Sequence, residues 1–216
     1  KTFINGEILE TEARTAEMCK LTENSFRDVN IAFANELSFL CDNNGVDVWE
    51  LINLANHHPR VNILQPGTGV GGHCIAVDPW FIVSQDPENS RIIKTAREIN
   101  DSKPEWVVDK IKATANSIST KKVACLGLAF KPDIDDLRES PAVRVVESLI
   151  EQGYEVSCVE PNINNHKKYN LIDIKKAIAE FDVIALLVKH KEFISDEILT
   201  ELEIKGSLDF CGTFSQ

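Results

Sequence analysis

Apolar residues in the first half of the chain recur at the spacing of an α-helix. Between residues 14 and 43 they follow one another at steps of three and four, which predicts a long helix. Gly45 comes directly afterwards and is the expected left-handed cap. Residues 1–13 predict a strand-like or irregular lead-in. The apolar positions of this long helix are Val29, Phe33, Leu37 and Leu40.

Capping signals predict further helices in the same half. Asp47 and Glu50 form a capping box, and Pro59 ends the helix that it starts. Helices joined by so short a connection normally pack antiparallel. The later expected elements are an apolar segment at 80–83, a polar turn at Pro87, a helix at 90–100 and, from a second capping box at 102–105, a helix to about 117.

After Lys121 the pattern changes to short apolar runs that alternate with helices. This alternation predicts a parallel sheet covered by helices on both faces. The chain is therefore expected to form a helical domain at 1–117 and an α/β domain at 118–216. The predicted strands are 123–126, 156–159, 183–188 and 207–210, and the predicted helices are 141–153, 172–180 and 192–202.

Composition narrows the possible classes of protein. A net charge of −11 without a basic run argues against a general nucleic-acid-binding surface. The six cysteines form no C-x-x-C pair, so neither a disulfide framework nor a structural zinc site is expected. No signal peptide or long apolar span is apparent, and we expect a cytoplasmic protein without a membrane partner. Lys1 stands where an initiator methionine is usual, which suggests a piece of a longer protein.

Residues 66–79 carry the most specific chemistry of the chain. Gly67, Gly69, Gly71 and Gly72 precede His73 and Cys74, and Asp78 follows. Glycine lets the backbone approach a ligand closely, and a thiol after such a run is typical of a nucleophile presented to substrate. A glycine-rich turn followed by a buried cysteine is the alternative.

Other polar residues allow two interpretations each. Lys20 and Asn24 project from one helical face, either as a functional pair or as a solvated stripe in which Glu17 pairs with Lys20. His57, His58 and Arg60, together with His73 and Cys74, match no zinc-ligand spacing, so no metal is expected.

The first loop of the α/β half reads GLAFKPD and holds one glycine where a dinucleotide fingerprint needs three. Glu160 ends the second strand and resembles the acid that binds ribose in dinucleotide folds. Lys131 and Arg138 suit a phosphate or carboxylate, or are solvated charges.

Four segments together resemble the UDP-glucose/GDP-mannose dehydrogenase family of nucleotide-sugar 6-dehydrogenases. They are residues 16–37, residues 58–81, the linking helix and residues 125–142. That resemblance implies an N-terminal NAD-binding domain, a central helical dimerisation domain and a Rossmann-like UDP-binding domain. This chain matches the last two parts and contains no NAD fingerprint. We therefore expect the NAD domain to be absent from it and the chain alone to be inactive.

The resemblance also implies the chemistry. NAD-dependent oxidation of a sugar C6 alcohol gives an aldehyde, which Cys74 captures as a thiohemiacetal; a second oxidation gives a thioester that water hydrolyses. A thiol suits this role because it both adds and leaves readily. Lys20 and Asn24 would stabilise the oxyanion at C6. Asp78 would hold and deprotonate water together with Lys20.

Binding roles follow from the same resemblance. The glycine segment 67–72 would pass along the sugar and ribose, and Phe130 and Lys131 would bind uridine diphosphate. Arg60 would reach across a homodimer formed by the central helices, and Arg138 would face the cofactor.

The sequence of residues 69–81 is most similar to that of family members that oxidise UDP-N-acetyl-D-mannosamine for bacterial surface polysaccharides. UDP-glucose enzymes tend to carry Ser where His73 stands. The alternative substrates are UDP-N-acetylglucosamine and UDP-glucose. The alternative function is that of a non-catalytic dimerising module that binds a UDP-sugar.

Overall fold

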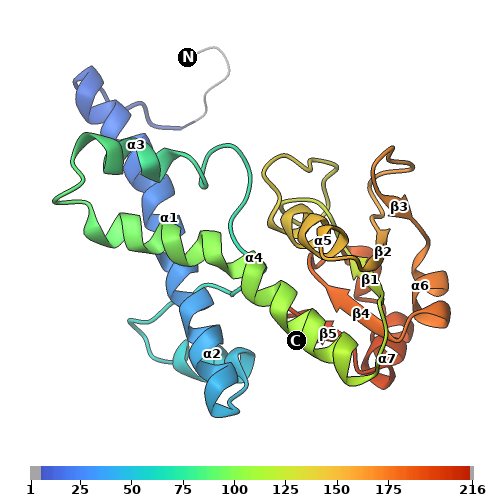
Figure 1. The fold of residues 1–216 in the computed structure, drawn as a ribbon. Coiled ribbons are helices and arrows are strands. Elements are labelled where there is room, and N and C mark those ends of the chain that lie inside the picture. Colours follow the sequence, from blue (N-terminus) through green and yellow to red (C-terminus); the bar gives the residue numbers. More distant parts are fainter. Residues whose placement is uncertain (1–5, 215–216) are drawn as a thin grey trace.

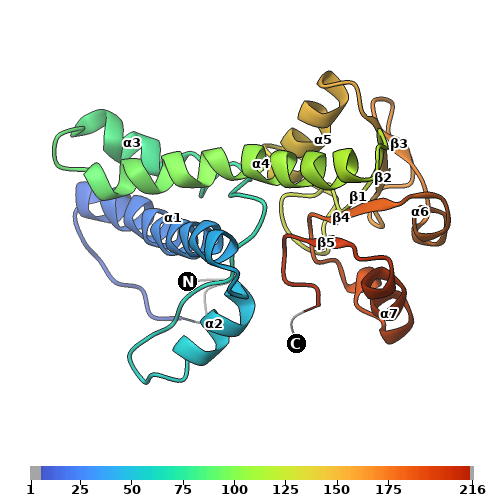
Figure 2. The same ribbon diagram turned by 60° about the horizontal axis from the view of Figure 1, so that its bottom comes forward.

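A single long helix joins the two parts of the chain. The computed structural model describes residues 6–214. The helix α4 (Arg91–Ser117) extends from the helical part of the chain to the part that contains a parallel sheet (Figure 1). The first half of α4 lies against α1 (Ala13–Asn44), and its second half lies on the sheet (Figure 2). Val107 and Ile111 of α4 are fully buried in the core of the sheet. Both parts are therefore packed on one rigid element.

The start of the chain follows the sequence prediction closely. Residues 6–12 form neither helix nor strand, whereas residues 1–5 of the expected lead-in lie outside the described residues. Gly45 ends α1 with φ +66°, as a left-handed cap requires. The side chain of Asp47 accepts hydrogen bonds from the N–H groups of Trp49 and Glu50 and starts α2 (Val48–Ala55).

The apolar segment at 80–83, for which the sequence indicated no element type, lies in a helix, α3 (Asp78–Gln85). One prediction about the central helices is wrong. The predicted break before Pro104 is missing, because α4 continues through it. A proline inside a helix costs about 3 kcal/mol. Asn100, Lys103 and Val107 are buried on both sides of this proline, and their packing outweighs that cost.

The buried face of α1 is polar rather than apolar. Asn35 and Asp28 are fully buried, whereas Phe33 and Leu40 of the apolar stripe are 52% and 53% exposed. Asn35 donates a hydrogen bond to Asn100 of α4 over 2.9 Å and accepts one from the N–H of Gly67 over 2.9 Å. The polar face of α1 thus fixes both α4 and the start of the glycine segment.

The second part is the predicted parallel sheet, in the order β3-β2-β1-β4-β5. Neighbouring strands pair in register, for example Val123 with Val156 and with Val183. One core lies between the sheet and α4 and α5, and a second core lies on the opposite face beneath α6 and α7. The strands are β1 (Lys122–Leu126), β2 (Glu155–Val159), β3 (Asn170–Leu171), β4 (Val183–Leu186) and β5 (Leu208–Asp209), and the helices are α5 (Pro141–Glu151), α6 (Ile174–Glu180), the short 3-10 turn η1 (Lys191–Phe193) and α7 (Asp196–Ile204).

The sequence prediction missed only small elements of this sheet. β3 has two residues and leaves no periodic signal. The predicted helix at 192–202 is divided into η1 and α7. Within residues 6–214, no helix combines the length and apolar character needed to cross a membrane. The predicted division between residues 117 and 118 falls at the end of α4 and stays a prediction.

Candidate active site

A cavity of about 420 Å³ opens where α1, the glycine segment and the loop after β1 meet. Cys74 lines this cavity together with the three glycines nearest to it, and Phe130 and Lys131 form the side contributed by the loop after β1. Residues far apart in the sequence are thus brought to one place. Cys74 itself is exposed, so the interpretation as a buried structural cysteine does not hold.

The glycines of this segment are required by close packing. A Cβ on Gly71 would lie 2.4 Å from the carbonyl oxygen of Glu139. Gly72 has φ +82°, and a Cβ there would lie 2.9 Å from the ring of Phe130. Gly69 has φ +133°. Gly67 differs, because its Cβ would have open space. The segment therefore packs directly on the loop that carries Phe130.

Asn24 and Asp78 are not among the residues that line this cavity, but they meet at the turn that follows Cys74. The amide Nδ2 of Asn24 donates to Oδ2 of Asp78 over 2.5 Å. Asp78 begins α3, and its backbone N–H donates to the carbonyl of Cys74 over 2.8 Å. The hydrogen bonds therefore link Asn24, Asp78 and the Cys74 turn in one local arrangement.

Lys20 lies one turn before Asn24 on α1 and is solvent-exposed. Its Nζ is 3.8 Å from a carboxylate oxygen of Glu23, and both side chains are more than 60% exposed. Such a pair contributes little to stability. The sequence interpretation paired Lys20 with Glu17 instead. No interaction between Lys20 and Cys74 is recorded in the described part of the chain, so their convergence on one carbon atom stays a prediction.

Sequence reasoning missed Arg27 and Ile31, which line the cavity from α1. They continue the spacing of Lys20 and Asn24 by steps of three and four, so helical periodicity on the polar face was the available signal. It also missed Asn35, whose contact with Gly67 depends on the packing of α1 on α4.

Arg138 and Arg60 lie outside the lining of this cavity. Arg138 is exposed and binds the carboxylate of Asp136 through Nε and a terminal nitrogen, over 2.9 and 2.6 Å. These hydrogen bonds lower the pKa of Asp136 to about 2. Arg60 follows α2, which lies at the opposite end of α1 from α3 (Figure 1). Arg60 thus shares no cavity lining with Cys74.

His57, His58 and His73 belong to no group of neighbouring potential metal ligands in the described residues. His57 pairs with the carbonyl of Asn53, and His58 accepts from the N–H of Arg60. In residues 6–214 one group has its potential ligand atoms close together, namely Asp133, His190 and Glu192. Both ring nitrogens of His190 are already engaged in hydrogen bonds. This group therefore gives no reason to expect an ion.

Glu160 is not presented to a ribose. It is 5% exposed, and its Oε2 accepts from the N–H groups of Leu128 and Ala129 over 2.7 and 3.1 Å. Burial raises the pKa of Glu160, but hydrogen bonds from His190, Leu128 and Asn162 outweigh it and lower the pKa to about 2. The expected similarity to a ribose-binding acid is therefore wrong.

Comparison with known proteins agrees with this fold. Residues 14–102 match the central domain of the UDP-glucose/GDP-mannose dehydrogenase family, and residues 124–214 match its UDP-binding domain. UDP-N-acetyl-D-mannosamine dehydrogenase of Campylobacter jejuni is 61% identical over 93% of this chain and 52% of its own length.

Solved structures give the same result. The UDP-N-acetyl-mannosamine dehydrogenase of Staphylococcus aureus matches with a TM-score of 0.81 and 48% identity, over 90% of this chain and 46% of that chain. The enzyme of Pyrococcus horikoshii matches with a TM-score of 0.86 and 38% identity, over 98% and 51%. This chain spans about half the length of the relatives it matches. It belongs to the UDP-glucose/GDP-mannose dehydrogenase family, whose central and UDP-binding domains it contains.

Proposed function

We propose that this chain supplies the substrate-binding and covalent-catalysis part of an NAD-dependent dehydrogenase. The substrate would be UDP-N-acetyl-D-mannosamine, oxidised at C6 from alcohol to carboxylate. The observation that carries the proposal is the cavity shared by Cys74, the glycine segment, Phe130 and Lys131. The names of the similar proteins support the choice of sugar.

In this mechanism the chain's own residues handle the aldehyde and the acyl group. The Cys74 thiolate bonds to the aldehyde carbon, and the electron pair of the C=O π bond moves to the oxygen, which becomes an oxyanion that Asn24 and Lys20 stabilise. After the second oxidation, Asp78 takes a proton from a water that attacks the thioester, and the Cys74 thiolate leaves. The Asn24–Asp78 hydrogen bond supports this assignment because it holds Asp78 at the Cys74 turn.

NAD, when bound, accepts the hydride in each oxidation. The described residues do not fit a dinucleotide at the usual strand–loop position. The loop after β1 has the single glycine Gly127, and Glu160 already binds the N–H groups of Leu128 and Ala129. In our proposal NAD is held by residues other than these, with Arg138 facing it from its exposed position.

Phe130 and Lys131 are proposed to bind uridine diphosphate. The exposed Lys131 ammonium lies on the cavity wall and would contact a phosphate. The glycine segment forms the adjoining wall, where the lack of side chains leaves room for the sugar.

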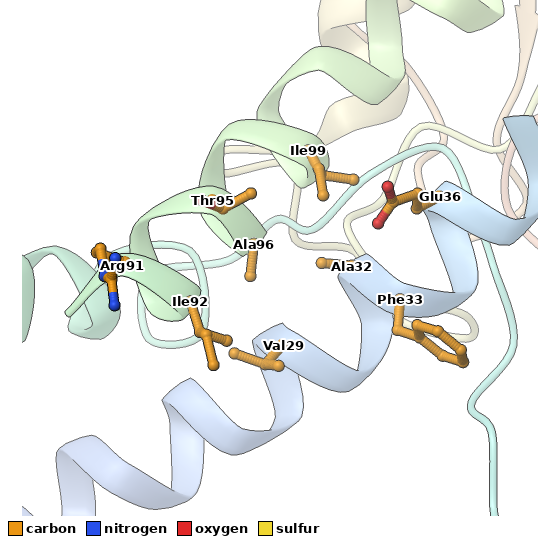
Figure 3. A pocket seen from close by; sticks show the side chains of 9 residues that line it. All are labelled: Val29, Ala32, Phe33, Glu36, Arg91, Ile92, Thr95, Ala96 and Ile99. Atoms are coloured by element: carbon orange, nitrogen blue, oxygen red, sulfur yellow. The ribbon is translucent and has the colours of Figure 1, made fainter.

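We also propose a homodimer formed by the central helices. A mostly apolar groove of about 430 Å³ lies between α1 and α4 (Figure 3). Phe33 and Ile92 at this groove are 52% and 73% exposed. A second copy covering this face would bury apolar surface, which monomers rarely leave exposed in large patches. A dimer would also allow Arg60 to reach the partner's substrate.

Ligand binding by this chain tests the proposal. We expect titration calorimetry to detect UDP and UDP-N-acetyl-D-mannosamine, with Lys131→Ala weakening both about tenfold through loss of a charge-assisted contact. ADP is the control nucleotide. Equal affinity for ADP and UDP would contradict the assignment. UDP-N-acetylglucosamine and UDP-glucose in parallel titrations test the choice of sugar.

The second candidate is a non-catalytic module that dimerises and binds a UDP-sugar. It is favoured because Glu160 already binds the backbone N–H groups of the loop after β1, where a dinucleotide would otherwise bind. We expect no NAD reduction by this chain alone. NAD reduction by the pure chain would contradict both that candidate and our placement of the NAD site.

A further inference from the structure

The loop that carries Phe130 and Lys131 is anchored at its first end by a buried carboxylate. Oε2 of Glu160 accepts from the backbone N–H groups of Leu128 and Ala129, immediately before Phe130. Oε1 of the same carboxylate accepts from the N–H of Asn162 over 3.1 Å. The Glu160 carboxylate thus occupies the backbone N–H donors that follow the carboxyl end of β1.

A buried histidine anchors the second end of the same loop. Nδ1 of His190 accepts from the backbone N–H of Asp133 over 3.0 Å. Because Nδ1 acts as an acceptor, the ring proton lies on Nε2. That Nε2 is 3.2 Å from Oε2 of Glu160 and donates to it. The two anchors are therefore one connected unit.

Burial makes this unit costly to disturb. The side chains of Glu160 and His190 are both fully buried. A buried carboxylate that loses a donor is left partly unpaired, which destabilises the local structure because the desolvated group is no longer fully hydrogen-bonded. The loop is thus held in one conformation, whereas Phe130 and Lys131 between the anchors remain at the cavity.

We propose that Glu160 and His190 are positioning residues for UDP-sugar binding, acting through Phe130 and Lys131. The inference rests on the proposed function, because it assigns the loop to the nucleotide. A loop that is ordered before binding saves the cost of ordering it on binding. Phe130 also touches Gly71 and Gly72, so its position is shared with the Cys74 segment.

The contacts of the two ring nitrogens of His190 can be removed separately; Nδ1 also lies 3.2 Å from the side-chain amide of Asn162. His190→Asn keeps an acceptor near the place of Nδ1 and loses the donor to Glu160. His190→Gln keeps a donor near the place of Nε2 and loses the acceptor for Asp133. Glu160→Gln replaces one acceptor oxygen by an amide NH2 group, which cannot accept a hydrogen bond. Glu147→Gln is the matched control, since Glu147 binds Lys168 and Tyr169 away from this loop.

The test measures UDP affinity by calorimetry and amide hydrogen exchange across residues 127–133 for each variant of this chain. We expect Glu160→Gln to weaken UDP binding about tenfold and to speed exchange at Leu128 and Ala129. His190→Gln should speed exchange at Asp133. Glu147→Gln should change neither.

A double-mutant cycle separates positioning from general damage. In the Lys131→Ala background, Glu160→Gln should cause a much smaller further loss of UDP affinity, because the residues act as one unit. Full additivity would overturn the inference, as would unchanged affinity in Glu160→Gln and both His190 variants. If Glu160→Gln fails to fold, the His190 variants decide the question in the same cycle. Failure of the wild-type chain to bind UDP would instead overturn the proposed function, and the binding role of the anchors with it.

Discussion

The amide of Asn24 donates to the carboxylate of Asp78 over 2.5 Å, although 54 residues separate them in the sequence. The bond joins the middle of α1 to the first residue of α3, one turn after Cys74. It gives Asn24 two proposed tasks, because the side chain would both orient Asp78 and stabilise charge at the substrate carbon.

Asn24→Ala should therefore reduce acid formation in an active dehydrogenase that contains this chain. Loss of one oxyanion donor costs about 10²–10³ in rate. The measurement is NADH formation from UDP-N-acetyl-D-mannosamine. Asn30→Ala is the control, because Asn30 lies on the same helix and its side chain donates to the carbonyl of Phe26 within that helix. A rate within about twofold of wild type would remove Asn24 from the mechanism.

Cys74→Ser should abolish acid formation, since a serine hydroxyl is a weaker nucleophile and a poorer leaving group. Cys19→Ser is a suitable control because Cys19 is also exposed but lies on α1 outside the cavity lining. The carboxylate product is measured by mass spectrometry. Unchanged conversion by Cys74→Ser would exclude a thiol intermediate.

Gly71→Ala should destabilise the chain, because the new Cβ would lie 2.4 Å from the Glu139 carbonyl and 2.6 Å from Pro141. Overpacking of this kind costs about 1–3 kcal/mol in the free energy of unfolding. Gly67→Ala has open space and should remain within about 0.5 kcal/mol of wild type. Urea denaturation measures both. Equal stability of the two variants would contradict the packing described here.

Helix periodicity, capping and the change of pattern after Lys121 were enough to predict the two-part fold. The continuous helix through Pro104 was not predictable locally, because tertiary packing on both sides decides it. The site was predictable where a motif is contiguous, as at Gly71 to Cys74. It was not predictable where partners come from distant segments: Asn35 beneath Gly67, and Glu160 beneath Leu128, depend on contacts that no local pattern encodes.

The exposed apolar stripe of α1 leads to a prediction about assembly. Ile92→Glu places a charge in the groove between α1 and α4, and a desolvated unpaired charge should prevent association. Sedimentation should find dimers for wild type and monomers for this variant. Ile204→Glu on α7 is the control, because Ile204 is 80% exposed and outside the groove. A monomeric wild type would contradict the proposed homodimer.

Lys103 leads to a prediction about pH. Its Nζ lies 3.7 Å from the Trp106 ring centroid and 4.4 Å from that of Phe39, and it donates to Ser38. Burial of Lys103 lowers its pKa to about 7; Asp42 partly opposes this shift, whereas Lys110 adds to it. In the unfolded chain the pKa returns to its usual value near 10.5.

Between those two pH values the unfolded state binds more protons at Lys103 than the folded state, so this residue makes the folded state more favourable as pH rises. Below pH 7 both states are protonated and the contribution is at its minimum. Lys103→Met should therefore remove a rise in the free energy of unfolding between about pH 7 and pH 10. Urea denaturation across this range, with Lys94→Met as an exposed-lysine control on the same helix, measures the difference. Parallel pH profiles for wild type and Lys103→Met would show that Lys103 stays protonated in the folded chain.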